Sequence, residues 1–231
     1  MFDFPAPPTI LFIVNELNMT EKQITSEWTG TKGKIMAWFL NSTLRTLIEV
    51  WLLGMPGSAF LNEVSHRIRG DEVVLDVGAG SGYFSLAIAK KLNTGKVICF
   101  DLSEEMLQRL KHKAKKEDLE DRIQIMNGEA SSLKLNDESV DLVVSNFVLH
   151  EVSSPEIILM EMIRALKPNG RVIITDFLSN TLLGKLEVVY HSAETHGPFS
   201  VNELEVLFAK CGLKDIKVSR IKSWIIGMGK K

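Results

Sequence analysis

The stretch LDVGAGSGYFS, at residues 75–85, contains the residues whose types and spacing best indicate chemistry. Gly78, Gly80 and Gly82 alternate with small residues directly after an apolar run. Glycines in this arrangement let a ligand approach the backbone closely, as they do in nucleotide-binding loops that join a strand to a helix. The loop therefore predicts a binding site for a ligand of the nucleotide type.

Two acidic residues near the loop narrow the class of ligand. Asp76 precedes Gly78 by two positions, where a carboxylate would repel a pyrophosphate but attract a cation. Asp101 ends the next apolar run, where a carboxylate accepts hydrogen bonds from ribose hydroxyls. The G-x-G-x-G spacing also departs from the dinucleotide pattern G-x-G-x-x-G, which disfavours an NAD-dependent oxidoreductase. The expected ligand has a ribose, a positive charge and no phosphate, and S-adenosylmethionine has this description.

Short apolar runs alternate with helical patterns and predict the fold that positions this loop. We expect five strands, at residues 73–77, 96–102, 122–128, 140–149 and 171–177. We expect helices at residues 83–92, 104–116, 155–167 and 201–212. Ser103 is the expected cap of the second, and Ser200 with Glu203 forms a capping-box pattern at the start of the last. Such alternation is typical of a parallel sheet covered on both faces. Two more strands, at 216–221 and 224–230, predict an antiparallel C-terminal hairpin. The expected fold class is α/β, a Rossmann-like doubly wound, mostly parallel seven-stranded sheet.

Five motifs occur in order between residues 73 and 177: VVLDVGAGSG, FDLS, NGEASSL, VDLVVSNFVLHEV and LKPNGRVIITDF. With them the chain resembles the class I S-adenosylmethionine-dependent methyltransferases. It is most similar to the subgroup that includes ubiquinone and menaquinone C-methyltransferases and many small-molecule enzymes. The resemblance implies S-adenosylmethionine as methyl donor, S-adenosylhomocysteine as product and a small-molecule acceptor.

The resemblance also implies roles for individual residues. Asp76 would lie near the methionine amino group, Asn146 near the methionine portion, and Asp101 would hold the ribose. Other residues expected against the cofactor are Gly78, Ala79, Gly80 and Gly82 in the loop, Leu102 and Met106 flanking the adenine, and Glu129 and Ala130 at the adenine edge.

Two histidines are candidates for acid–base chemistry. His150 follows the fourth strand, at the edge of the sheet where ligands bind, and imidazole titrates near neutral pH. His196 follows the fifth strand, in a segment that often forms the substrate wall in this fold. Structural roles are the alternative for both, and Asp176, which ends the fifth strand, is a further candidate to face substrate. Many methyltransferases need no strong base, because the sulfonium is an activated donor.

Composition and charge restrict the partners. The chain has 231 residues, of which 45% are hydrophobic and 24% charged, and a formal net charge of −2. It lacks the basic excess of nucleic-acid-binding proteins, so we expect no nucleic-acid partner. An RNA or protein methyltransferase and a non-catalytic cofactor-binding subunit are the alternatives. Cys99 and Cys211 have no partners at metal-ligand spacing, so we expect no metal and a reducing, cytoplasmic compartment.

Residues 1–70 form a predicted helical N-terminal cap, and residues 71–231 form the predicted S-adenosylmethionine-binding core. Residues 19–28 contain a capping-box pattern, and residues 34–53 are apolar almost all round a helix. That helix would act as a lid over a lipophilic or aromatic acceptor, pack on the sheet, or form a homodimer interface. No apolar stretch is long enough to span a bilayer, and peripheral membrane contact is left open.

Overall fold

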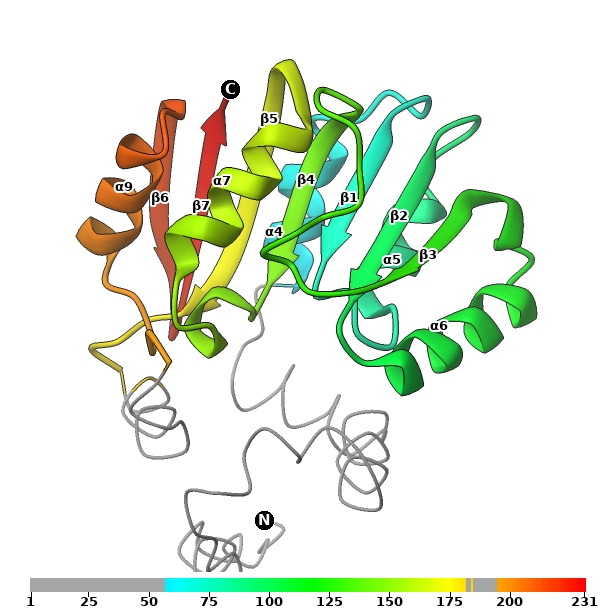
Figure 1. The fold of residues 1–231 in the computed structure, drawn as a ribbon, viewed down its shortest axis with the longest axis horizontal. Coiled ribbons are helices and arrows are strands. Elements are labelled where there is room, and N and C mark those ends of the chain that lie inside the picture. Colours follow the sequence, from blue (N-terminus) through cyan, green and yellow to red (C-terminus); the bar gives the residue numbers. More distant parts are fainter. Residues whose placement is uncertain (1–56, 182–183, 185–194) are drawn as a thin grey trace, which may run out of the picture.

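A seven-stranded sheet forms the centre of the computed structural model, which describes residues 57–181, Gly184 and residues 195–231 (Figure 1). The patterns at 19–28 and 34–53 lie outside the described residues. The strand order is β3-β2-β1-β4-β5-β7-β6. The strands are β1 Val73–Val77, β2 Lys96–Asp101, β3 Ile123–Asn127, β4 Val140–Asn146, β5 Leu166–Phe177, β6 Lys214–Ile221 and β7 Trp224–Lys230. The first five are parallel, whereas β7 runs antiparallel to both β5 and β6, so the predicted fold class is confirmed.

Helices cover both faces of the sheet (Figure 1). They are α4 Gly57–Ser65, α5 Tyr83–Ala89, α6 Glu104–Lys116, α7 Pro155–Ala165 and α9 Val201–Lys210, with short 3-10 turns η3 Glu120–Arg122 and η4 Leu149–Glu151. One buried apolar cluster joins α4, α5 and α6 to the sheet, and the other joins α7 and α9 to the opposite face. This is the two-sided covering that apolar parallel strands require.

Capping residues fix the helices that were predicted best. The hydroxyl of Ser103 accepts a hydrogen bond from the Met106 amide, and α6 spans the predicted 104–116. Ser200 and Glu203 form a reciprocal capping box at the start of α9. Both caps satisfy amides that would otherwise lack partners at a helix start.

Several predicted boundaries are wrong by a few residues. The fourth strand ends at Asn146 rather than 149, because Phe147 has a φ of 58° and turns the chain out of the sheet. Helices α5 and α7 end at Ala89 and Ala165, before the predicted 92 and 167. The fifth strand begins at Leu166, which pairs with Val140, rather than at 171.

The described end of the predicted cap packs on the core. Phe60 and Val64 of α4 are fully buried, and the Phe60 ring meets Phe84 of α5 edge-on, with 4.8 Å between centroids. This part of residues 1–70 is therefore held by the same apolar cluster as the sheet. Among the described residues, no helix is long and apolar enough to cross a membrane.

Candidate functional site

The glycine loop connects β1 to α5 at the edge where the parallel strands end. The amides of Gly78 and Ala79 both donate to the carbonyl of Phe100 on β2, at 2.8 and 3.1 Å, so the loop is bound to the neighbouring strand. Gly78 has a φ of 77°, and a Cβ there would lie 2.1 Å from Val148 Cγ2. Gly80 has a φ of 51°, but a Cβ there would meet nothing within 4 Å. Gly78 is thus required by packing, whereas Gly80 borders open space that a ligand can fill.

Asp101 joins the end of β2 to the glycine loop. Its Oδ2 accepts a hydrogen bond from the Gly80 amide at 2.7 Å, and its Oδ1 accepts one from the Ser103 amide at 2.8 Å. Each carboxylate oxygen keeps a further lone pair that can accept from a hydroxyl. Burial raises the pKa of Asp101, and the backbone hydrogen bonds oppose that rise. The carboxylate is therefore oriented in advance for a ligand with hydroxyl donors.

Asp76 is a buried carboxyl group on β1, with only 2% of its surface exposed. Its Oδ2 accepts a hydrogen bond from the Ser85 hydroxyl of α5 at 2.5 Å. Burial, more than the nearby Asp101 charge, raises the pKa of Asp76 to about 7. A cation bound beside Asp76 would offset this penalty, because an opposite charge favours the ionised carboxylate.

The residues expected around the adenine follow β2 and β3. Leu102 is 70% exposed, whereas Met106 is buried at the start of α6. Glu129 is exposed and Ala130 is half-buried, both just after the end of β3. Gly128 links this segment to β2, since its amide donates to the carbonyl of Asp101. These residues therefore border the same strand ends as Asp101.

Asn146 ends β4, between the glycine loop and β5. Its Oδ1 accepts a hydrogen bond from the Thr175 hydroxyl at 2.5 Å, and the two residues are direct partners across the strands. Only 7% of Asn146 is exposed, and its Nδ2 has no hydrogen-bond partner among the described residues. Thr175 was not foreseen as part of the site.

His150 and Asp176 lie together where β4 and β5 end. His150 Nδ1 is 2.7 Å from Asp176 Oδ1, and the side chains are 2% and 0% exposed. The Asp176 carboxylate also accepts hydrogen bonds from the amides of His150 and Phe177. On the other side of the ring, His150 Nε2 is 3.8 Å from Glu151 Oε1. The sequence marked His150 and Asp176 separately, and the structure brings them into contact.

His196 is exposed, and its ring stacks on Phe199 with 4.1 Å between centroids. Its segment is bound to the one after β4, because the His196 amide donates to Val152 and the Gly197 amide donates to the carbonyl of His150. His196 is thus brought to the same edge of the sheet as His150. The stacking of the His196 ring on Phe199 is a contact that exposed loop side chains commonly make.

Aromatic side chains form a wall beside the pair. Phe147, Phe177 and Trp224 have ring centroids 4.8 to 5.4 Å apart. His150 meets Phe177 edge-on at 4.8 Å. Trp224 lies directly opposite Phe177 in the antiparallel pairing of β7 with β5. No local sequence motif identifies this group, although the hairpin turn before Trp224 places that residue at the edge where β5 ends.

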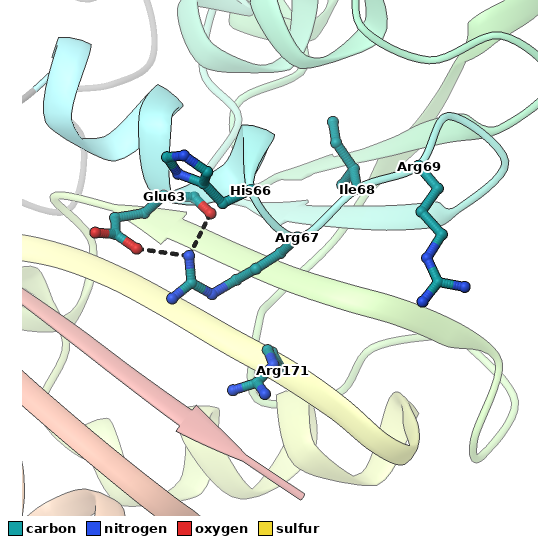
Figure 2. A pocket seen from close by; sticks show the side chains of 6 residues that line it. All are labelled: Glu63, His66, Arg67, Ile68, Arg69 and Arg171. Atoms are coloured by element: carbon teal, nitrogen blue, oxygen red, sulfur yellow. Dashed lines mark hydrogen bonds and ion pairs between the residues drawn. The ribbon is translucent and has the colours of Figure 1, made fainter.

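A hollow of about 470 Å³ lies elsewhere (Figure 2). It is lined by Glu63, His66, Arg67, Ile68, Arg69 and Arg171. These residues precede β1 or lie early in β5, so they border the opposite edge of the sheet from the glycine loop. The hollow is therefore separate from the candidate site. The described residues also contain no group of three or more side chains able to hold a metal ion.

Comparison with known proteins agrees with this geometry. A family model described as "Methyltransferase domain" matches residues 68–211, more than half of the chain. A demethylmenaquinone methyltransferase of Oceanobacillus iheyensis is 34% identical over 126 residues, covering 54% of this chain and 52% of that protein. A ubiquinone/menaquinone biosynthesis C-methyltransferase of Roseobacter denitrificans is 29% identical over 124 residues, covering 53% of this chain and 50% of its own. The chain thus matches about half the length of these curated relatives.

A solved structure shares the fold. It is a SAM-dependent methyltransferase from Aquifex aeolicus, with a TM-score of 0.65 and 23% sequence identity. The match covers 85% of this chain and 96% of that one. At 23% sequence identity, this similarity shows a shared fold alone.

Proposed function

The chain belongs to the methyltransferase-domain family, and from this membership we propose that it transfers a methyl group from S-adenosylmethionine to a small-molecule acceptor. The observation that carries the proposal is the link between Asp101 and the glycine loop. The Gly80 amide holds the Asp101 carboxylate beside a backbone with no side chain, and the acidic Asp76 lies one strand away. This arrangement suits a nucleoside that carries a positive charge.

The proposed cofactor-binding residues fall into groups, and each group lies near the end of a different strand. Asp101 binds the ribose, Gly80 allows close approach with Gly78 beside it in the loop, and Asp76 and Asn146 lie at the methionine end. The remaining contacts are Ala79 and Gly82 in the loop and Leu102, Met106, Glu129 and Ala130 around the adenine. When bound, S-adenosylmethionine supplies a methyl group on a positively charged sulfur. The protein's task is then to hold the acceptor in line with that group and to exclude water.

The acceptor we propose is lipophilic or aromatic. Phe147 and Phe177 are half-buried beside the strand ends and pack against the buried Trp224, so their rings offer an apolar surface suited to a planar ring. The Oceanobacillus relative is named for demethylmenaquinone, which contains such a ring. An arsenite methyltransferase of Halobacterium salinarum also matches, at 26% identity. Arsenic is a poor candidate acceptor, because it binds clustered thiols and the chain has only two cysteines, Cys99 and Cys211.

His150 is the residue we propose as proton acceptor. The Asp176 carboxylate, on the Nδ1 side of the ring, stabilises the imidazolium that forms when the methyl acceptor gives its proton to His150. His196 lies on the adjoining segment and would contact the acceptor from there.

Labelled methyl transfer tests the proposal. The protein is incubated with S-adenosylmethionine carrying a radioactive methyl group and a cell extract, and organic, aqueous, protein and RNA fractions are separated. We expect label in the organic fraction. The Asp101→Ala variant is the control, since it should lose the transfer.

Label in any other fraction, or no transfer at all, would change the proposed function in a specific way. Label among aqueous metabolites would keep a small-molecule acceptor but contradict a lipophilic one. Label in protein or RNA would contradict the substrate class. Tight binding of S-adenosylmethionine without transfer to any fraction would favour a non-catalytic cofactor-binding subunit.

A further inference from the structure

The hollow at the opposite edge of the sheet from the glycine loop has an excess of positive charge. Its lining contains three arginines, Arg67, Arg69 and Arg171, but only one acidic residue, Glu63. The whole chain has 27 basic and 29 acidic residues, so this excess is local. Figure 2 shows Arg67 and Arg69 on the segment between α4 and β1, and Arg171 on β5. Two segments that are distant in the sequence therefore bring guanidinium groups to one hollow.

The carboxylates beside this hollow are already bound to other groups. Arg67 Nη1 donates to the carboxylate and to the carbonyl of Glu63, both at 2.5 Å. The Glu72 carboxylate accepts hydrogen bonds from backbone amides, one of which is the amide of Arg69. Within the described part of the chain, no acceptor is hydrogen-bonded to the guanidinium of Arg69 or of Arg171. These two guanidinium groups therefore keep their N–H donors for a ligand.

A row of basic residues continues from Arg171 across the sheet. Arg171 on β5 is directly opposite Lys230 on β7, and Lys230 is directly opposite Lys214 on β6. Side chains in such direct positions share one face of the sheet, with Cβ atoms roughly 5 Å apart, and like charges placed there destabilise it. Lys230 follows Met228 by two residues, so the row is on the face covered by α4. An anion bound beside this row would remove the repulsion.

The ligand class follows from the donors and from the size of the hollow. A guanidinium group binds phosphate oxygens through two parallel N–H groups, and a lysine adds a point charge. The hollow has a volume of about 470 Å³, which is in the range of small-molecule sites and suits a compact ligand rather than a flat lipid surface. Several cations at short spacing favour a group with several negative charges. Linked phosphates combine these properties.

We propose that this hollow binds a di- or triphosphate group, held by Arg69 and Arg171 with Lys230 beside them. Arg67, whose Nη1 is fixed by Glu63, contributes its remaining N–H donors. The site lies at the opposite edge of the sheet from the glycine loop. It is therefore a second site, and it does not depend on the proposed methyl transfer.

Inorganic triphosphate is the probe for this site. Calorimetry on the full chain in low-salt buffer measures its dissociation constant. Arg171→Gln and Arg69→Gln each remove one guanidinium group and should weaken binding roughly 10- to 100-fold. Arg220→Gln is the matched control, because Arg220 is exposed near the far end of β6 from Lys214 and its replacement removes the same charge. This control should bind triphosphate as tightly as the unaltered protein.

Lys230→Gln tests the row of like charges. Without ligand, this change removes the repulsion between Lys230 and Arg171, so we expect the melting temperature to rise by about 1 to 3 °C. Triphosphate should then raise the melting temperature of the variant less than that of the unaltered protein. A melting temperature that falls in the absence of ligand would remove Lys230 from the site.

Urea unfolding shows whether each variant is folded, and Arg69 is exposed, so its replacement should leave stability unchanged. If the unaltered protein does not bind triphosphate, or if Arg220→Gln loses as much affinity as the other two variants, the proposal is overturned. Binding to phosphatidylglycerol vesicles without binding to triphosphate would also overturn it, in favour of an anionic lipid surface.

Discussion

His150 Nδ1 lies 2.7 Å from Asp176 Oδ1, and the two side chains are almost completely buried where β4 and β5 end. The amides of His150 and Phe177 donate to the same carboxylate at 3.1 and 2.7 Å. The negative charge is therefore fixed beside the imidazole.

Asp176→Asn keeps the size of the side chain and removes its charge. We expect the rate of methyl transfer to fall by about 10²- to 10⁴-fold, because the imidazolium loses its counter-charge. The loss should depend on pH, while affinity for S-adenosylmethionine stays unchanged. Initial rates between pH 6 and pH 9, with the acceptor identified by the labelling experiment, measure this.

His150→Gln should show the same loss, and the double variant should be no worse than either alone, because the two residues act as a unit. Asp121→Asn is the matched control, because Asp121 is exposed and lies before the start of β3, away from the ends of β4 and β5. Wild-type rates for Asp176→Asn at every pH would leave the pair with a structural role only.

Glycine substitutions should separate stability from binding. Gly78→Ala places a Cβ 2.1 Å from Val148 Cγ2, so we expect it to destabilise the fold by several kcal/mol or prevent folding. Gly80→Ala meets no atom within 4 Å and bears only the strain of positive φ, about 1 to 2 kcal/mol. Its Cβ occupies ligand space, so it should lose cofactor affinity strongly.

Urea unfolding and calorimetry on both variants distinguish these effects. If Gly80→Ala binds S-adenosylhomocysteine as tightly as the unaltered protein, the open space at Gly80 is not the cofactor cradle.

Removal of the Asp101 carboxylate should weaken the cofactor. Asp101→Ala deletes the acceptor for the ribose hydroxyls and releases the amides of Gly80 and Ser103. A hydrogen bond to a charged group contributes about 1.5 to 3 kcal/mol, which is roughly a 10- to 100-fold loss of affinity. Calorimetry with S-adenosylhomocysteine measures it, with Asp121→Ala as the control. Unchanged affinity would remove Asp101 from the ribose site.

Local signals made most of the fold predictable. Ser103 and Ser200 cap helices whose starts follow from the sequence, and β2 ends at the predicted acidic residue Asp101. The end of β4 was not predictable, because Phe147 adopts a positive φ that its residue type disfavours. Its conformation depends on contacts with Phe177 and Trp224, which are distant in the chain.

The site was predictable where one loop contains it and not where two strands meet. Asp76, Gly78 and Gly80 are close in sequence, and their spacing is sufficient to identify the loop. Asn146 with Thr175 joins β4 to β5 across 29 residues, and His150 with Asp176 joins η4 to β5 across 26 residues. Such pairs depend on strand order and register, which one sequence does not specify.

The buried Asp76 should make stability depend on pH. Its pKa is raised from 3.8 to about 7 in the folded protein, so the folded state binds this proton more tightly than the unfolded state. The stabilisation is therefore fully present below about pH 4 and is lost as pH rises through about 7, an effect of up to about 4 kcal/mol. Burial raises the pKa of Asp101 in the same direction and adds to the slope.

Urea unfolding at pH 5 and pH 8 measures this dependence, and Asp76→Asn isolates it because the amide keeps an oxygen for the Ser85 hydroxyl. We expect the variant to lose less stability between the two pH values than the unaltered protein. Affinity for S-adenosylmethionine should show the opposite trend and increase through pH 7, because the ligand's ammonium requires the ionised carboxylate. Stability and affinity that change with pH equally in both proteins would contradict this role of Asp76.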